Sequence, residues 1–145
     1  MVILTGVSGF IGSCLLTALN QHGYEREVVV VDDFYKLYKD KNTDGKAVRE
    51  WMHLDIFLDW FEKTTQKVDF VLHIGARTDT ALLDTDIFNH LNLHYSQRIW
   101  KVCSRRGIPL IYASSAATYG DGSKGFRDDH QLLPDLKPLN PYGES

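Results

Sequence analysis

Three glycines at positions 6, 9 and 12 constrain the fold of this chain more than any other feature of its 145 residues. The apolar run before them, Val2 to Thr5, predicts a buried strand. The apolar residues after them keep helical spacing as far as His22-Gly23, which predicts the end of a helix. The first glycine permits a tight turn, the second a close approach of the backbone to a ligand, and the third close packing of helix on strand.

Strands alternate with helices along most of the remaining chain. The polar stretch 35–49 is expected to be an exposed loop, and the chain after Tyr119 is expected to be mostly loop. Further strands are expected at 28–31, 51–54, 68–74 and 108–112, and helices at 56–65 and 84–106. This alternation predicts an α/β fold, a Rossmann-type doubly wound parallel sheet with right-handed crossovers. Ligands of such sheets bind beyond the carboxyl ends of the strands.

An acidic residue stands 20 positions after the last glycine of the turn. Asp32 ends the second expected strand, where its carboxylate can accept hydrogen bonds from ribose hydroxyls. A nicotinamide dinucleotide is therefore expected to bind here, rather than the segment being a plain turn beside a solvated strand end. The expected contacts in the turn are Gly6, Ser8, Gly9, Phe10, Ile11 and Gly12.

The same region leaves NAD and NADP open as the cofactor. Two adjacent carboxylates, Asp32 and Asp33, repel a 2′-phosphate and so favour NAD. Lys36 and Lys39 follow closely and could neutralise a 2′-phosphate. Asp33 and Lys39 are accordingly included among the expected cofactor contacts.

Ser115 and Tyr142 form a candidate catalytic pair. Hydride transfer at a carbinol carbon needs a base for the hydroxyl proton, and a tyrosine beside a cation can serve. A serine hydroxyl can hold the same oxygen in place. Taken alone, a serine after a strand and a tyrosine in a proline-rich segment are more often structural.

Three segments of the chain carry a resemblance to a known family. The glycine turn 6–12, the run Tyr-Ala-Ser-Ser-Ala-Ala-Thr-Tyr-Gly at 112–120 and the run Pro-Leu-Asn-Pro-Tyr-Gly-Glu-Ser at 138–145 resemble those of the extended short-chain dehydrogenases, the NAD-dependent epimerases and dehydratases. Within that family the last two runs are most similar to the ADP-L-glycero-D-manno-heptose 6-epimerases. The resemblance implies that Ser115 and Tyr142 are the active-site Ser/Thr and Tyr.

The resemblance also implies further cofactor contacts and shows departures. The additional contacts that it implies are Asp55, Ile56, Gly75, Ala76, Asn92 and Tyr142 itself. Ile74 stands where those epimerases carry Glu, and Arg77-Thr78-Asp79-Thr80 replaces a Ser/Thr-rich segment. Asp33 replaces a residue that is often an amide. These departures bear on the sugar and on the cofactor preference rather than on the fold.

The resemblance predicts a fragment of a larger two-domain protein. Residues 1–145 would be a truncated NAD(P)-binding Rossmann domain, without the carboxy-terminal substrate domain. The family's lysine would fall on position 146, and it is the cation that helps the tyrosine accept a proton, so we expect the chain as printed to be inactive. The full-length protein is expected to hold one NADP or NAD tightly per subunit, to act on a nucleotide sugar and to form homo-oligomers.

The expected function is that of a sugar-nucleotide epimerase, most like the heptose 6-epimerases, acting by transient oxidation and re-reduction of a sugar carbon. Another epimerase, dehydratase or reductase of the family remains open, although a dehydratase usually has an acidic pair where Ala116-Ala117 stands. A non-catalytic NAD(P)-sensing module is the alternative from a different class.

Composition excludes several other classes of protein. The net charge of −3 gives no reason to expect nucleic acid, and no apolar run reaches the roughly 20 residues that span a bilayer. Two cysteines in no metal or redox spacing suit a reduced, cytoplasmic location. His90 and His94 are four apart, but nothing nearby supplies further ligands, so no metal site is expected.

Overall fold

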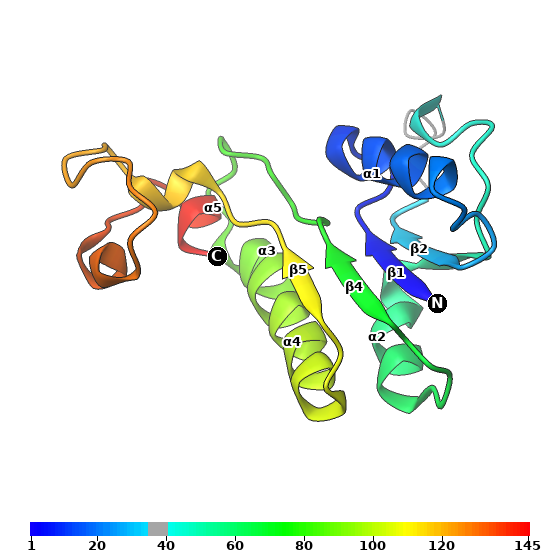
Figure 1. The fold of residues 1–145 in the computed structure, drawn as a ribbon. Helices are drawn as coiled ribbons and strands as arrows, with labels where there is room; N and C mark the ends of the chain where they lie inside the picture. The colour runs from blue at the N-terminus through cyan, green and yellow to red at the C-terminus, as the bar shows by residue number, and fades with distance from the viewer. Residues whose placement is uncertain (35–40) are drawn as a thin grey trace. The chain divides into compact units, whose positions relative to one another are not determined.

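The structure is a computed structural model that describes residues 1–34 and 41–145. It divides into two units, which Figure 1 shows as a ribbon. Unit 1 contains residues 1–75 and 96–113, and unit 2 contains residues 76–95 and 114–145. The expected contact Lys39 lies outside the described residues.

A five-stranded parallel sheet forms the centre of unit 1, in the order β3-β2-β1-β4-β5. The strands are β1 (Val2–Thr5), β2 (Val28–Asp32), β3 (Glu50–His53), β4 (Phe70–His73) and β5 (Leu110–Tyr112). The expected doubly wound parallel sheet is confirmed, with strand bounds within two residues of those predicted. The strand order reverses between β1 and β4, which is where such sheets bind their ligands.

Burial on both faces explains why β1 and β2 are continuous apolar runs. Every residue of both strands is buried. Because side chains alternate along a strand, one set faces each side of the sheet. The buried cluster on one face is formed by Val2, Leu4, Val7, Leu16, Val28 and Val30. The alternate residues, Ile3 and Val29 among them, therefore pack on the opposite face, and no polar face is left for solvent.

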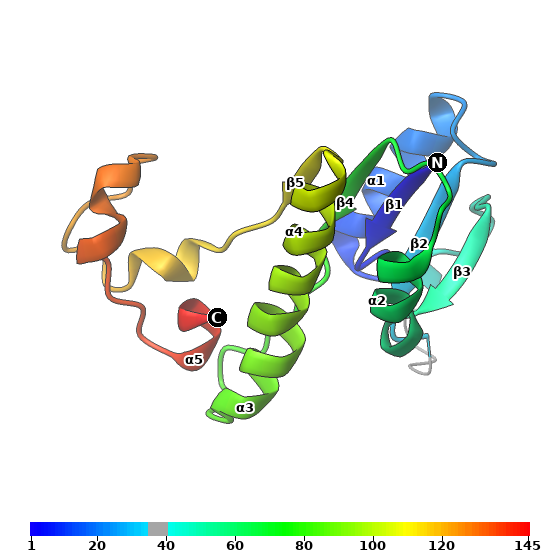
Figure 2. The ribbon, with the colours of Figure 1, turned by 90° about the horizontal axis from the view of Figure 1, so that it is seen from below.

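Helices lie on both faces of the sheet (Figures 1 and 2). α1 (Phe10–Gln21) lies on one face, and α2 (Leu54–Lys63) and α4 (Tyr95–Arg106) lie on the other. The guanidinium of Arg98 on α4 donates to Asp59 at 3.0 Å and to Glu62 at 2.9 Å, both on α2. The crossovers from β3 to β4 and from β4 to β5 are therefore neighbours, as right-handed connections require in this strand order.

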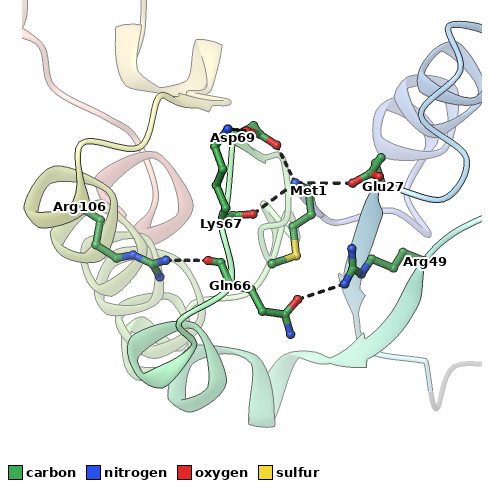
Figure 3. Close-up of polar contacts among 7 residues, drawn as sticks. All are labelled: Met1, Glu27, Arg49, Gln66, Lys67, Asp69 and Arg106. Atoms are coloured by element: carbon green, nitrogen blue, oxygen red, sulfur yellow. Dashed lines mark hydrogen bonds and ion pairs between the residues drawn. The ribbon is translucent and has the colours of Figure 1, made fainter.

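Polar contacts join the segments that precede the strands (Figure 3). The ammonium of Met1 contacts the Asp69 carboxylate at 2.6 Å and the Glu27 carboxylate at 3.7 Å. The ammonium, and after it Lys67, holds the pKa of Asp69 below its usual value. Arg106 donates to the carbonyl of Gln66 at 2.9 Å. These contacts belong to the amino ends of β1, β2 and β4, so they leave the carboxyl ends to other functions.

Unit 2 contains short helical elements joined by loops. α3 (Thr85–Phe88) leads into a π-helical stretch, η2 (Asn89–His94), and then into α4. The expected helix over 84–106 is thus confirmed in extent, although its middle is π-helical. The expected loop after Tyr119 contains short turns, with η3 (Ala116–Tyr119) before it and η4 (His130–Asp135) and α5 (Pro141–Glu144) within it.

No helix in residues 1–34 and 41–145 is long and apolar enough to cross a membrane.

Candidate functional site

The glycine turn after β1 is closed so tightly that two of its positions admit no side chain. Gly6 has φ +73°, and a Cβ there would lie 2.5 Å from Cα of Gly75, which follows β4. A Cβ on Gly12 would collide with the carbonyl oxygen of Gly6. The helix α1 therefore starts in direct contact with the turn, as expected if Gly12 permits close packing of helix on strand.

Among residues 1–34 and 41–145, no side chain caps the amino end of α1. Gly9 is the N-cap and supplies no side-chain cap, and the first turn carries no acidic residue. The side chains of Phe10 and Ile11 are 80% and 59% exposed. Free N–H groups at a helix start attract an anion such as a phosphate, so this turn fits the pyrophosphate of a dinucleotide.

Asp32 is locked to the same turn. Its Oδ2 accepts a hydrogen bond from the backbone N–H of Ser8 at 2.8 Å, and its Oδ1 accepts one from the N–H of Asp33 at 2.7 Å. Its side chain is almost fully buried. The carboxylate is therefore held at the end of β2 in one orientation, which is what recognition of a ribose diol needs.

Two side chains that the sequence analysis missed brace the turn from the segment after β2. Nδ2 of Asn42 donates to the carbonyl of Ser8 at 2.8 Å. Nζ of Lys46 donates to the carbonyl of Ser13 at 2.7 Å. Both lie in the lysine-rich stretch that was expected to be an exposed loop, and sequence alone gave no signal for either contact.

A histidine stands between two expected cofactor contacts at the end of β3. His53 pairs with Asp32 in the sheet register. Its Nε2 lies 3.6 Å from Oδ1 of Asp33, and its Nδ1 lies 3.3 Å from Oδ2 of Asp55. Ile56 follows with a side chain that is 60% exposed. Asp33, Asp55 and Ile56 are therefore placed at the carboxyl ends of adjacent strands.

His73 ties β4 to β1 and to α4 beneath the turn. Its Nδ1 lies 2.6 Å from Oγ1 of Thr5, and its Nε2 lies 2.8 Å from Oγ of Ser96. Thr5 Oγ1 also accepts the N–H of Gly75 at 3.1 Å. Burial lowers the pKa of His73 from 6.5 to about 4. The ring is therefore neutral at pH 7, and it links β4 to β1, the strand that leads into the glycine turn.

Acid is expected to destabilise the protein through His73. The unfolded chain binds a proton on this ring below about pH 6.5, whereas the folded chain does so only below about pH 4. The free energy of unfolding should therefore fall by up to about 3 kcal/mol as the pH drops through that window. Urea unfolding of wild type and His73→Gln between pH 4 and 7.5 measures the difference in slope. His90→Gln, an exposed histidine, is the matched control and should keep the wild-type slope; equal slopes in wild type and His73→Gln would contradict the assignment.

Asn92 organises unit 2. Its Oδ1 accepts the N–H of Arg77 at 2.7 Å, and its Nδ2 donates to the carbonyl of Arg77 at 3.0 Å and to Oγ of Ser145 at 2.9 Å. Ser145 Oγ in turn donates to the carbonyl of Tyr142 at 2.9 Å. Asn92 is buried and lies in the π-helical stretch, a feature frequent at functional sites. The chain after Ala76 is thus tied to the helix that carries Tyr142.

Ser115 and Tyr142 lie on elements that pack on each other. Ser115 is the N-cap of η3, where its Oγ accepts the N–H of Ala117 at 3.1 Å. A Cβ on Gly143 would lie 2.9 Å from the carbonyl oxygen of Ala117, so α5 meets η3 backbone to backbone. Asn140 caps α5 and Pro141 starts it, which explains the Asn-Pro-Tyr-Gly run. Both expected catalytic residues are therefore in unit 2, in adjoining short helices.

Each unit thus gathers a part of the expected site. Unit 1 holds the turn residues with Asp32, Asp33, Asp55, Ile56 and Gly75, and unit 2 holds Ala76, Asn92, Ser115 and Tyr142. Their roles in binding and catalysis stay predictions. No cluster of three or more His, Cys, Asp or Glu side chains suited to a metal occurs in the part of the chain that the structure describes.

Curated relatives match the whole chain. An ADP-L-glycero-D-manno-heptose-6-epimerase of Nitratidesulfovibrio vulgaris is 43% identical over 147 residues, covering 100% of this chain and 45% of the relative. The enzyme of the same name from Fusobacterium nucleatum is 36% identical over 149 residues, again with 100% and 45% covered. The chain therefore spans about 45% of the length of the curated relatives it matches.

Solved structures and a family model agree with the fold. The heptose-6-epimerase of Helicobacter pylori superposes with a TM-score of 0.74 at 23% identity, covering 99% of this chain and 46% of that chain, a likeness that shows the fold alone. The model of the NAD dependent epimerase/dehydratase family matches residues 2–145. Because that match takes in the glycine turn, the segment of Ser115 and the segment of Tyr142 together, the chain belongs to the NAD dependent epimerase/dehydratase family.

Proposed function

We propose that this chain is the NAD(P)-binding part of a sugar-nucleotide epimerase that inverts C6 of ADP-glyceromanno-heptose. The observation that carries the proposal is the packing of α5 on η3, which brings the elements of Tyr142 and Ser115 together. The 43% identity to a heptose-6-epimerase supports the choice of sugar. The 45% share of that relative's length supports a longer protein with a separate part for the sugar nucleotide.

Unit 1 supplies the residues that would hold NAD(P). The uncapped start of α1 at Gly9 would bind the pyrophosphate through backbone N–H groups. Asp32 would accept the ribose hydroxyls, since Ser8 and Asp33 fix its carboxylate. When bound, the nicotinamide ring supplies a site that takes up a hydride and returns it, so the cofactor is regenerated in each cycle.

The residues of unit 2 would manage the proton and the sugar oxygen. Tyr142 would accept the proton of the sugar hydroxyl while the carbon is oxidised, and would return it on reduction. Ser115 would hold the same oxygen with a hydrogen bond from its hydroxyl. Asn92 would keep α5 in place through Ser145. Epimerisation requires, in addition, that the transient carbonyl present its other face before reduction.

NMR of full-length protein with nucleotide sugars tests the proposal directly. ADP-glyceromanno-heptose should show inversion at C6, and UDP-glucose should show no inversion at C4. The protein should retain NAD(P) through purification and should need none added. Inversion at C4 alone would identify a different epimerase of the family. A steady stoichiometric demand for NAD(P)H would identify a reductase, and NAD(P) binding without turnover would identify a sensing module.

Asp33→Asn is expected to shift the cofactor preference toward NADP. Asp33 directly follows Asp32, whose carboxylate accepts the Asp33 N–H, so a ribose held by Asp32 would bring a 2′-phosphate toward this second negative charge. Removing its charge removes a like-charge repulsion, so the ratio of NADP to NAD affinity should rise at least about tenfold. Titration of both cofactors into the full-length protein measures the ratio. Asp59→Asn, an exposed carboxylate on α2, should leave it unchanged, and an unaltered ratio in Asp33→Asn would rule out this role.

A further inference from the structure

We propose that Arg77 is an anion-binding residue of the substrate site, whose guanidinium takes a phosphate group of the sugar nucleotide. The inference rests on the proposed function, since it names what the same site recognises. Within residues 1–34 and 41–145, Nε of Arg77 is buried and has no hydrogen-bond partner. The side chain as a whole is 38% exposed, so a ligand from solvent can reach part of it.

Within the described residues Arg77 makes one ion pair, and that pair is too weak to explain why an arginine stands at this position. Its Nη2 lies 3.4 Å from Oδ2 of Asp79, two residues away, and both side chains are substantially exposed. Such a pair contributes little to stability. A buried donor without an acceptor is costly, and a protein seldom keeps one without a use for it.

The Nε–Nη2 edge of Arg77 would serve a ligand once the partly exposed side chain turns and brings Nε to the surface. That edge presents two parallel N–H groups, which match two oxygens of a phosphate and bind it bidentately. A phosphate with one oxygen on Nε and another on Nη2 would satisfy the buried donor and replace the long contact to Asp79. A carboxylate could make the same pair of bonds, but a sugar nucleotide offers phosphates.

The backbone of Arg77 is fixed in a way that suits a binding residue. Asn92 bonds both the N–H and the carbonyl of Arg77, at 2.7 and 3.0 Å, as a neighbouring strand would. Asn92 is held in turn by Ser145, which bonds the carbonyl of Tyr142. One continuous network thus joins the Arg77 backbone to the helix that carries the proposed proton acceptor. Because the backbone of Arg77 is already fixed, binding an anion would have to order only its side chain.

The test compares Arg77→Gln with Arg77→Lys in the full-length protein. In Arg77→Gln the KM for the nucleotide sugar should rise about 10- to 100-fold, while kcat stays within about threefold. Arg77→Lys keeps the charge but loses the paired N–H groups, so its KM should lie between those of wild type and Arg77→Gln. Lys124→Gln removes an exposed charge from the same unit and should leave KM unchanged.

A binding measurement separates this proposal from the proposed function. ADP or UDP is titrated into the NAD(P)-saturated proteins, and the wild-type affinity should weaken about 10- to 100-fold in Arg77→Gln. That loss would support the anion site even if no nucleotide sugar is epimerised. Equal affinities of wild type and Arg77→Gln, absence of binding by the saturated wild type, or a variant that instead loses NAD(P) would each overturn it.

Discussion

Replacing Tyr142 by phenylalanine in the full-length protein will lower kcat by about 10²- to 10⁴-fold and leave NAD(P) affinity within about threefold. The change removes only the hydroxyl that would take the sugar proton. The ring stays, and it lies against Phe88 with centroids 6.1 Å apart, so the packing of α5 is kept. The backbone carbonyl of Tyr142 still accepts from Ser145. Rate measurements on the nucleotide sugar, with NAD(P) titrations alongside, separate chemistry from binding.

Two further variants give this prediction its controls. Tyr24→Phe removes a phenol from unit 1, where that ring packs on Phe70, and should leave kcat unchanged. Ser115→Ala should lower kcat about 10²-fold, but it also removes the cap of η3 and with it about 1 kcal/mol of stability. Its unfolding must therefore be measured too. If Tyr142→Phe keeps more than a tenth of wild-type kcat, another group accepts the proton.

The sheet could be predicted from the sequence because its signals are local. Val28 to Val31 form an uninterrupted β-branched run, which only a strand buried on both faces accommodates well. The glycine spacing fixed the first turn, since the backbone contacts at Gly6 and Gly12 admit no larger residue. Right-handed crossovers then limited the strand orders to a few. Residue types and their spacing within short segments were enough to predict these strands and this turn.

The contacts that hold the site could not be predicted, because their partners lie far apart in sequence. Asn42 bonds Ser8 from 34 residues away, and His73 bonds Thr5 from 68 residues away. An asparagine in a polar stretch and a histidine at a strand end have many other uses. The spacing of apolar residues around Asn92 also gave no indication that this part of the helix is π-helical. Ser115 and Tyr142 were found through the family resemblance rather than through their chemistry alone.

Gly9→Ala and Gly12→Ala are expected to separate cofactor binding from stability at one turn. A Cβ on Gly12 collides with the carbonyl oxygen of Gly6, which is backbone and can move only if the turn opens. Gly12→Ala should therefore lose on the order of 3 kcal/mol of unfolding free energy and most of its NAD(P) affinity. A Cβ on Gly9 meets the same oxygen at 3.4 Å, an ordinary contact, and Gly9 has φ −76°, which any residue adopts.

Gly9→Ala should accordingly keep the unfolding free energy within about 1 kcal/mol of wild type. Its methyl group would stand at the open start of α1, where the pyrophosphate would approach the backbone. The affinity for NAD(P) should therefore fall at least about tenfold, which corresponds to one lost charge-assisted hydrogen bond. Urea unfolding and NAD(P) titration of the full-length variants measure both quantities. A Gly9→Ala variant that binds NAD(P) like wild type would place the pyrophosphate elsewhere. The added methyl group leaves folding unaffected, so it can lower the affinity only if the ligand contacts the backbone at Gly9.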